Sequence, residues 1–220
     1  MLLLAFDTAT PAVTAALHDG TTVVAESTRI DARRHGELLL PAIDRVLRDA
    51  GAAKGDLTAL AVGVGPGPYT GLRVGLVTAA ALGHALGIPV HGVCTLDGLA
   101  RAARAEGVTG PFAAVTDARR KEVYWAAYDE HGARVSGPDV DRPADIADRL
   151  AGAPAVGAGA LLHAGVLTGA RGPEHVSAGH LAAHAAERLA AGGDLLPPVP
   201  LYLRRPDAQV PAGYKAVLPA

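Results

Sequence analysis

The feature that most constrains the fold is an internal repeat with an offset of 110 residues, half of the 220-residue chain. This offset places Asp7 on Asp117 and Asp19 on Asp129. Asp7 and Asp117 each end an apolar stretch that is followed by a turn and a second stretch of strand character. Two halves of this kind predict an α/β protein of two related lobes, with a cleft between them. The aspartate that ends the first strand of each lobe is then expected to face that cleft.

The order of elements in each half is predicted as three strands, a helix, a strand and a helix. The stretches LLLAFD, AVTAALHD and TTVVAEST are apolar, alternating or β-branched, which is typical of strands. Turns are predicted at Thr10-Pro11 and Asp19-Gly20. Further helices are expected near 36–50, 71–87, 95–107, 143–151 and 177–191, with strands at 57–65, 89–94, 111–117 and 153–159. The lobes are predicted to span 1–100 and 101–220, the second ending in a Pro-rich tail.

Charge and cysteine content exclude several classes of protein. Twenty Lys and Arg against 22 Asp and Glu give a net charge of −2, which argues against nucleic-acid binding by this chain alone. The single Cys94 excludes a disulfide framework and suits a reducing cytoplasm, where a buried, inert thiol is expected. Residues 74–96 lack charged side chains, but His84 and Pro89 favour a helix, a turn and a strand over a membrane span. The N-terminus lacks the basic region of a signal peptide.

The stretch FDTAT is a candidate nucleotide site. Asp7, Thr8 and Thr10 offer the carboxylate and hydroxyl oxygens that suit hydrated Mg²⁺ and a phosphate. The alternative is that these residues shape the turn between two strands. By the repeat, Asp117 receives the same two interpretations.

The stretch GVGPGPYTGLRVG (63–75) resembles a phosphate-binding loop but lacks the Walker pattern. Its two prolines have no N–H to offer an anion, so a tight turn from strand to helix is favoured. The helix after it carries Gly or Ala at every fourth position, which forms a ribbon of small side chains along one side. The ribbon predicts close packing, against this chain or against another subunit. Its members are Gly71, Gly75, Ala79, Gly83 and Gly87.

Two other catalytic chemistries have weak support. His180 and His184 lie four residues apart, a spacing found in metal sites, but no third ligand is evident. A solvated helix face is the favoured explanation for that pair, so no metal is predicted. None of the three serines lies in G-x-S-x-G.

Taken together and in order, five motifs resemble the TsaB (YeaZ) family of bacterial threonylcarbamoyladenosine synthesis. They are LLAFDTAT, RRHGELLLPAI, GVGPGPYTGLRVG, TDARRKEVYWAAYD and PLYLR, and the resemblance covers about residues 1–205. It implies the actin/Hsp70/sugar-kinase-like (ribonuclease H-like) fold of two related lobes. It also implies similarity to the partner subunit TsaD, which transfers the threonylcarbamoyl group to tRNA.

The resemblance implies a non-catalytic subunit that binds TsaD, acts with TsaE and forms a homodimer when alone. Contact with tRNA is then expected only through the complex, no membrane is involved, and ATP or ADP enters only at the level of the complex. The subunit interface is expected on the helix near 36–50 and the helix after the 63–75 loop. Its expected members are His35, Leu39, Ile43, Val46, Leu47, Tyr69, Gly71, Arg73, Gly75, Ala79 and Gly83.

Departures from TsaD support this interpretation. Thr95 and Leu99 stand where TsaD-type proteins carry the two histidines of an H-x-E-G-H-like metal element. Neither side chain replaces a neutral imidazole as a transition-metal ligand. Ala9 stands where actin-like nucleotide motifs usually have Gly, and its methyl group crowds the path of a phosphate. The alternatives are an autonomous actin-like ATPase or small-molecule kinase that uses Asp7 and Asp117, and a metallopeptidase.

Overall fold

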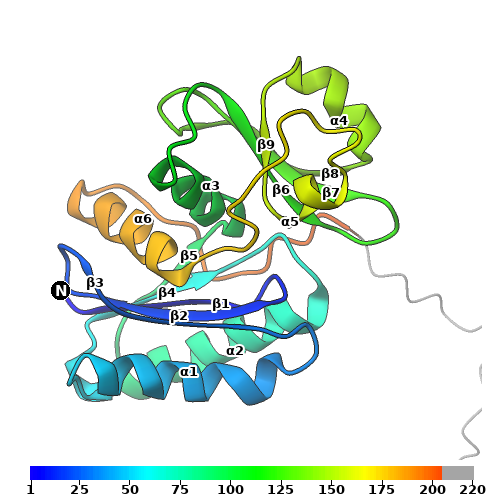
Figure 1. The fold of residues 1–220 in the computed structure, drawn as a ribbon. Helices are drawn as coiled ribbons and strands as arrows, with labels where there is room; N and C mark the ends of the chain where they lie inside the picture. The colour runs from blue at the N-terminus through cyan, green and yellow to red at the C-terminus, as the bar shows by residue number, and fades with distance from the viewer. Residues whose placement is uncertain (205–220) are drawn as a thin grey trace, which may run out of the picture.

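The protein contains two mixed β-sheets, each flanked by helices, in a computed structural model that describes residues 1–204 (Figure 1). The first sheet has five strands in the order β3-β2-β1-β4-β5 and the second has four in the order β8-β7-β6-β9. These two sheets confirm the predicted α/β architecture of two related lobes. The predicted lobe boundary at residue 100 stays a prediction, and residues 205–220 of the second lobe lie outside the described residues.

The strands of the first sheet match the predicted strands closely. β1 pairs antiparallel with β2 and parallel with β4, and β4 pairs parallel with β5. β1 is buried on both faces, because alternate side chains enter different cores: Leu4 and Phe6 on one side, Leu3 and Ala5 on the other. The strands are β1 (Leu3–Asp7), β2 (Ala12–His18), β3 (Val23–Ile30), β4 (Ala59–Gly63) and β5 (Val90–Val93).

The second sheet repeats the first. β6 pairs antiparallel with β7 and parallel with the short β9, as β1 pairs with β2 and β4. The strands are β6 (Phe112–Asp117), β7 (Val123–Tyr128), β8 (Arg134–Asp141) and β9 (Ala155–Val156). Adding 110 to the bounds of β1, β2 and β3 reproduces the bounds of β6, β7 and β8 to within one residue.

The repeat extends to the turns between these strands. The carboxylate of Asp7 accepts a hydrogen bond from the N–H of Ala9, and Asp117 accepts one from the N–H of Arg119. At the far end of each hairpin, Asp19 and Asp129 each accept two backbone N–H groups of the following turn. Aspartate stabilises turns in this way, so the offset of 110 residues reflects a shared local structure.

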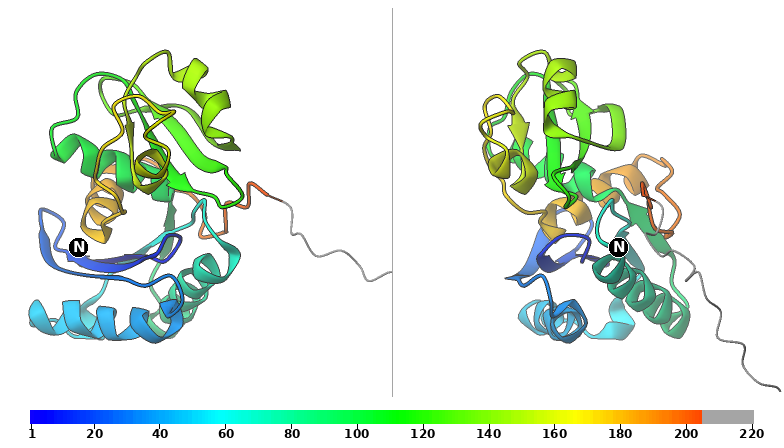
Figure 2. Two further views of the ribbon diagram at one scale, coloured as in Figure 1. Left: turned by 45° about the vertical axis from the view of Figure 1, so that its right-hand side comes forward. Right: turned by 90° about the vertical axis from the view of Figure 1, so that its right-hand side faces the viewer.

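Helices cover both faces of the first sheet (Figure 2). α1 (His35–Asp49) and α2 (Tyr69–Leu86) pack on the face that carries Leu4 and Phe6, and α6 (Ala178–Ala190) packs on the face that carries Leu3 and Ala5. Pro41 lies inside α1. α6 belongs to the second half of the sequence but packs on the sheet of the first half. Its N-terminus is held there by Thr14 and Glu26, which accept the N–H groups of Ala178 and Gly179.

The second sheet lies between α3 (Thr95–Ala105) on one face and α4 (Pro143–Leu150) with α5 (Ala158–Leu162) on the other. The short α5 and a 3-10 turn at Lys54–Asp56 have no counterpart in the sequence predictions. After α6 the chain returns along the first sheet, where Leu196 pairs with Gly92 and the N–H of Leu201 donates to Val64. No helix among residues 1–204 is long and apolar enough to cross a membrane.

Candidate functional site

The turn after β1 is a fully buried node of hydrogen bonds. Oδ1 of Asp7 accepts the N–H of Ala9 at 2.7 Å, and Oδ2 accepts the hydroxyl of Thr95 at 2.6 Å. Asp7 is completely inaccessible to solvent, and this burial raises its pKa against the opposing effect of those hydrogen bonds. Gly63 leaves the space for the carboxylate, since a Cβ there would lie 1.7 Å from Oδ2. Asp7 therefore points into the first lobe, contrary to the expectation that it faces the cleft.

Thr8 and Thr10 are also engaged within the chain. The hydroxyl of Thr8 donates to the carbonyl of Gly71 and accepts the N–H of Gly75, which ties the turn after β1 to the first turns of α2. The hydroxyl of Thr10 accepts the N–H of Ala12. Both side chains are buried. Their assignment to a cofactor stays a prediction, and the geometry gives each of them a structural role.

The loop between β4 and α2 packs directly on this turn. A Cβ at Gly67 would lie 2.1 Å from the carbonyl oxygen of Ala9, so only glycine allows the two segments to approach so closely. Gly65 adopts a φ of 93°, which also favours glycine. The loop is thus a packed strand-to-helix turn, as its prolines predicted.

The second aspartate of the repeat has a different environment. Asp117 is partly exposed, accepts the N–H of Arg119 at 2.7 Å and pairs with the guanidinium of the same residue at 3.2 Å. Unlike Asp7, it lines the cavity between the two lobes. Of the four predicted cofactor residues, Thr8, Thr10 and Asp117 therefore border one cavity, and Asp7 lies behind them.

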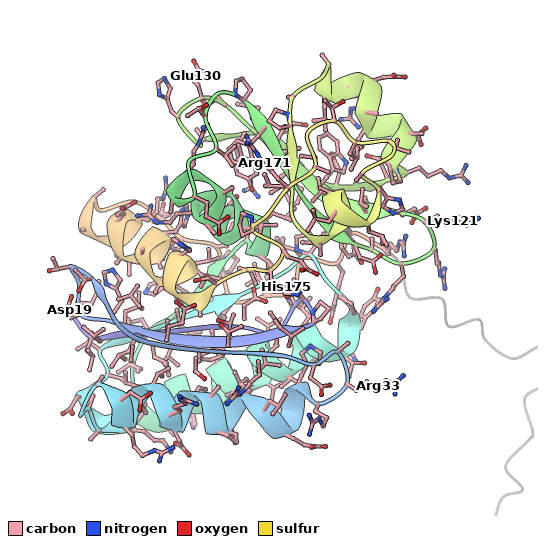
Figure 3. All side chains as sticks on the ribbon, viewed as in Figure 1. Asp19, Arg33, Lys121, Glu130, Arg171 and His175 are labelled. Atoms are coloured by element: carbon pink, nitrogen blue, oxygen red, sulfur yellow. The ribbon has the colours of Figure 1, made fainter. Side chains whose placement is uncertain are left out.

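This interlobe cavity has a volume of about 590 Å³. The first lobe contributes the turn after β1 and the first residues of α1 and α2, and the second lobe contributes Asp117, α5 and the segment before α6. In Figure 3, Arg33 and Lys121 extend from the two lobes on the same side of the molecule, and His175 lies between the lobes. Two buried polar atoms of the second lobe's wall, Thr116 Oγ1 and His175 Nδ1, have no hydrogen-bond partner among the described residues.

The residues predicted for a subunit interface fall into two groups. Four of them, on α1, are buried in the core beneath the first sheet: Leu39, Ile43, Val46 and Leu47. The small residues of α2 are buried too and approach this chain's own sheet. A Cβ at Gly71 or Gly75 would lie 2.4 or 2.6 Å from an oxygen of Thr8, and one at Gly83 would lie 2.3 Å from Val90 Cγ2. Four members of the ribbon, with the buried Ala79 among them, therefore pack within this chain, the first of the two alternatives, whereas Gly87 is exposed where α2 ends.

The remaining predicted interface residues lie nearer the surface. His35 Nε2 lies 2.8 Å from the carbonyl oxygen of Thr10, so this side chain fastens α1 to the turn after β1. Tyr69 donates its hydroxyl to the carbonyl of Arg204, and Arg73 donates to the hydroxyl of Tyr202. The exposed outer face of α2 carries Val77, which is 66% exposed. No charged residue occurs in α2 after Arg73.

The positions compared with metal ligands are occupied by core residues. Thr95 donates to Asp7, and Leu99 is fully buried in the core of the second lobe. Within residues 1–204, no group of three or more His, Cys, Asp or Glu side chains is arranged to hold a metal ion. His184 lines a different cavity, and burial lowers its pKa and that of His180. Cys94 is buried, and burial raises the pKa of its thiol to about 12.

Sequence reasoning missed two contacts that complete this region. The hydroxyl of Thr95, a position compared above only with a metal ligand, holds Asp7 across 88 positions of sequence. The ring centroid of Tyr202 lies 4.5 Å from that of Tyr69, which joins the end of the described chain to α2. No local signal marks a pair so distant in sequence. The nearest signals are the YTG stretch of the 63–75 loop and the PLYLR motif, since their tyrosines meet.

Comparison with known proteins places this two-lobed fold in a defined class. Residues 23–160 match the family described as TsaD: tRNA N6-adenosine threonylcarbamoyltransferase. The match covers most of both sheets, and the chain therefore belongs to this wider family.

Individual relatives narrow the assignment. YeaZ from Pseudomonas aeruginosa, a solved structure, superimposes with a TM-score of 0.81 at 30% identity, covering 92% of this chain and 99% of that one. TsaB of Escherichia coli, a tRNA threonylcarbamoyladenosine biosynthesis protein, is 42% identical over 60% of this chain and 58% of its own length. An uncharacterized protein of Mycobacterium tuberculosis is 47% identical over 94% of this chain and 93% of its own. The chain belongs to the TsaB/YeaZ family, as the motifs predicted, and this confirms its predicted fold class.

Proposed function

We propose that this chain is a non-catalytic subunit of the bacterial complex that makes threonylcarbamoyladenosine in tRNA. Family membership supports involvement in this modification. The observation that carries the non-catalytic role is the node at Asp7. One carboxylate oxygen accepts the Ala9 N–H and the other accepts the Thr95 hydroxyl, in a solvent-free site where a catalytic member of the wider family would need accessible ligands.

The partner we propose is a TsaD-type catalytic subunit, joined by TsaE, with a homodimer as the state of the chain alone. The proposed contact lies on the outer face of α1 and α2, where Leu40 is 53% and Val77 66% exposed. Beyond the exposed Arg73, the outer face of α2 carries no charged residue, which suits burial against another protein, because charged side chains are depleted at the core of interfaces. The buried side chains of both helices pack against the first sheet, which holds this outer face in position. The complex would act in the cytoplasm and contact tRNA only as an assembly.

We further propose that the chain alone binds no nucleotide, and that ATP or ADP enters only with the complex. The engaged hydroxyls of Thr8 and Thr10 support this proposal, as does the packing of Gly67 against Ala9. The second candidate function, an autonomous ATPase or kinase, has one observation in its favour. The cavity bordered by Asp117 is large enough for a small organic ligand. Calorimetry with ATP and Mg²⁺ separates the two, since an autonomous enzyme would bind and turn over ATP without TsaD.

The test of the partner role is the mass of the assembly with the TsaD of the same organism, measured by light scattering after gel filtration. We expect a one-to-one heterodimer from the native chain and its loss with Val77→Asp. The matched control is Val135→Asp, because Val135 is 65% exposed but lies on β8 of the other lobe. A native chain that does not join TsaD contradicts the proposed partner. Equal loss with both variants contradicts the proposed face.

A further inference from the structure

A second cavity, of about 630 Å³, shares no lining residue with the cavity between the lobes. It lies where α3, α6, β5 and the turn between β7 and β8 meet, and the segment at Leu195–Leu196 closes one side. Neither the fold comparison nor the proposed function uses it. Its ionisable lining side chains are Asp97, Arg101, Arg104, Tyr128, His131, Arg134, His184, Arg188 and Asp194, together with the buried Cys94.

Two of the four arginines in this cavity have carboxylate partners. Arg101 forms a bidentate ion pair with Glu187, in which its Nη1 lies 2.6 Å from Oε2 of the carboxylate. Arg134 lies 3.7 Å from Asp97, which also accepts the hydroxyl of Tyr128 at 2.8 Å. These two ion pairs hold the walls of the cavity in place. Within each pair, the charges of the arginine and the carboxylate largely cancel.

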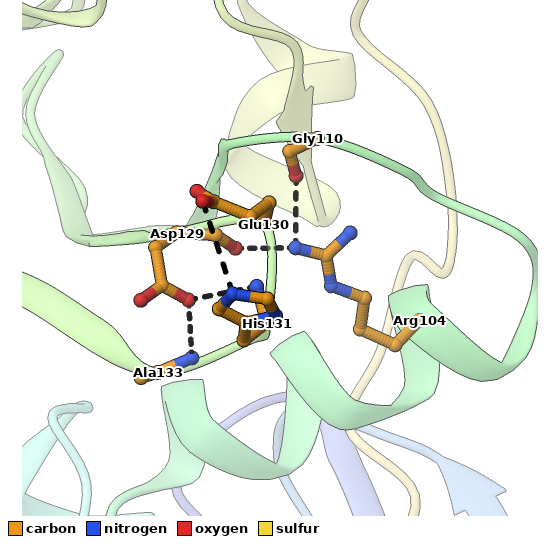
Figure 4. A network of polar contacts seen from close by, with 6 residues as sticks. All are labelled: Arg104, Gly110, Asp129, Glu130, His131 and Ala133. Carbon is orange, nitrogen blue, oxygen red and sulfur yellow. Dashed lines mark hydrogen bonds and ion pairs between the residues drawn. The ribbon is translucent and has the colours of Figure 1, made fainter.

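The other two arginines are held by carbonyl groups instead. Arg104 donates to the carbonyl of Val108 and also to those of Gly110 and Asp129, as Figure 4 shows for the last two, which joins α3 to the β7–β8 turn. Its Nε is buried without a hydrogen-bond partner among the described residues. Arg188 donates to the carbonyl of Asp194. Carbonyls satisfy hydrogen bonds but do not cancel a charge, so both guanidinium groups keep theirs.

The balance of charge around the cavity is positive. Its lining holds four guanidinium groups, and the carboxylates are three when Glu187 is counted with Asp97 and Asp194. Guanidinium groups from α3, β8 and α6 thus converge on one space from three elements. Planar guanidinium groups match the paired oxygens of a carboxylate or phosphate, and half-burial strengthens the attraction.

The rest of the lining is apolar. Leu195 and Leu196 are half-buried and supply a wall without ionisable groups, with Val93 and Ala100 buried behind it. Pockets for small organic molecules combine an apolar wall of this kind with a few polar groups that fix orientation, and their volumes start near 300 Å³. The cavity therefore suits a molecule with an apolar body as well as an anionic group, rather than an inorganic ion alone.

We propose that this cavity binds a small organic oxyanion, its carboxylate or phosphate group placed among the arginines and its apolar body on the side chains of Leu195 and Leu196. The site is independent of the partner face on α1 and α2 and of the cavity between the lobes. It gives the chain a ligand of its own, beyond the proposed part in tRNA modification.

The probes are benzoate and phenyl phosphate, which share an apolar ring and differ in the anionic group. With the ¹⁵N-labelled chain, we expect either probe to shift the amide signals of Gly132, Leu195 and Leu196 and to leave those of Thr70 and Gly71 in place. Tighter binding of one probe identifies the anionic group that the site prefers. Shifts confined to Thr70 and Gly71, or none at millimolar probe, would overturn the proposal.

Two variants test the site against unspecific attraction of anions. Arg188→Gln removes an exposed guanidinium from the cavity, and we expect about tenfold weaker binding, as for one lost charge-assisted hydrogen bond. Ala133→Trp places a ring at the mouth while the N–H that bonds Asp129 is kept, and should abolish binding. The control is Arg45→Gln on α1, which lies outside the cavity and should change nothing. Equal weakening by Arg45→Gln and Arg188→Gln would contradict a specific site.

Discussion

The two lobes begin with the same hairpin but use its first aspartate differently. Asp7 is buried, bonded to Thr95 and shielded from the cavity, whereas Asp117 is partly exposed and pairs with Arg119 at the cavity wall. The difference arises from what surrounds each hairpin. In the first lobe Gly63 of β4 and Thr95 at the start of α3 enclose the Asp7 carboxylate, whereas Asp117 lines the cavity beside α5. The same hydrogen bond from a backbone N–H to an aspartate can thus belong to a buried node in one lobe and to a surface turn in the other, although only the second turn has positive φ angles, at Arg119, Arg120 and Lys121.

The largest effect is expected where the first lobe has no spare space. Gly63→Ala places a methyl group on the Asp7 carboxylate and should lower the free energy of unfolding by more than about 3 kcal/mol, since the node cannot shift without losing its hydrogen bonds. Urea denaturation measures the change. Gly165→Ala is the matched control, because a Cβ there meets nothing within 4 Å. Similar stabilities of the two variants would show that the node is not tightly packed.

Replacing each of the two aspartates should lower the free energy of unfolding by less than Gly63→Ala does, and by unequal amounts. Asp7→Ala leaves the Thr95 hydroxyl and the Ala9 N–H unpaired in the interior and should cost about 2 to 3 kcal/mol of unfolding free energy. Asp117→Ala breaks a partly exposed ion pair and one turn hydrogen bond, and should cost less than about 1 kcal/mol. Both are measured by thermal and urea denaturation. Equal losses of unfolding free energy in the two variants would mean that the surroundings of Asp7 and Asp117 differ less than the burial of the two side chains indicates.

The smallest effect is a change in how stability depends on pH. The pKa of Asp7 is raised by burial, so the folded state holds its proton more tightly than the unfolded state does. The contribution of Asp7 to stability is then fully present below the pKa of the unfolded chain, about 4, and is lost as pH rises through the raised pKa. Compared with Asp7→Asn, the native chain should therefore lose stability as pH rises from about 4 towards neutrality. Urea denaturation of both proteins across this range tests it, and a constant or opposite difference would contradict the raised pKa.

Much of the first sheet could be predicted from sequence because its signals are local. Alternation and β-branched residues located β1, β2 and β3, and the offset of 110 located their counterparts. Leu39, Ile43, Val46 and Leu47 were predicted together as members of a subunit interface, and the structure buries them together beneath this chain's own sheet. Periodicity shows that a face is covered, and it does not show by what.

The amino-acid sequence by itself determined the repeat, the turns at the aspartates, the small-residue side of α2 and the family. These features depend on residues within a few positions of one another, or on motifs whose order is enough to identify relatives. Only the tertiary structure decided that Thr95 completes the Asp7 node, that Gly67 meets Ala9 and that four arginines converge on a second cavity. Those contacts join segments far apart in the chain, and packing alone brings them together.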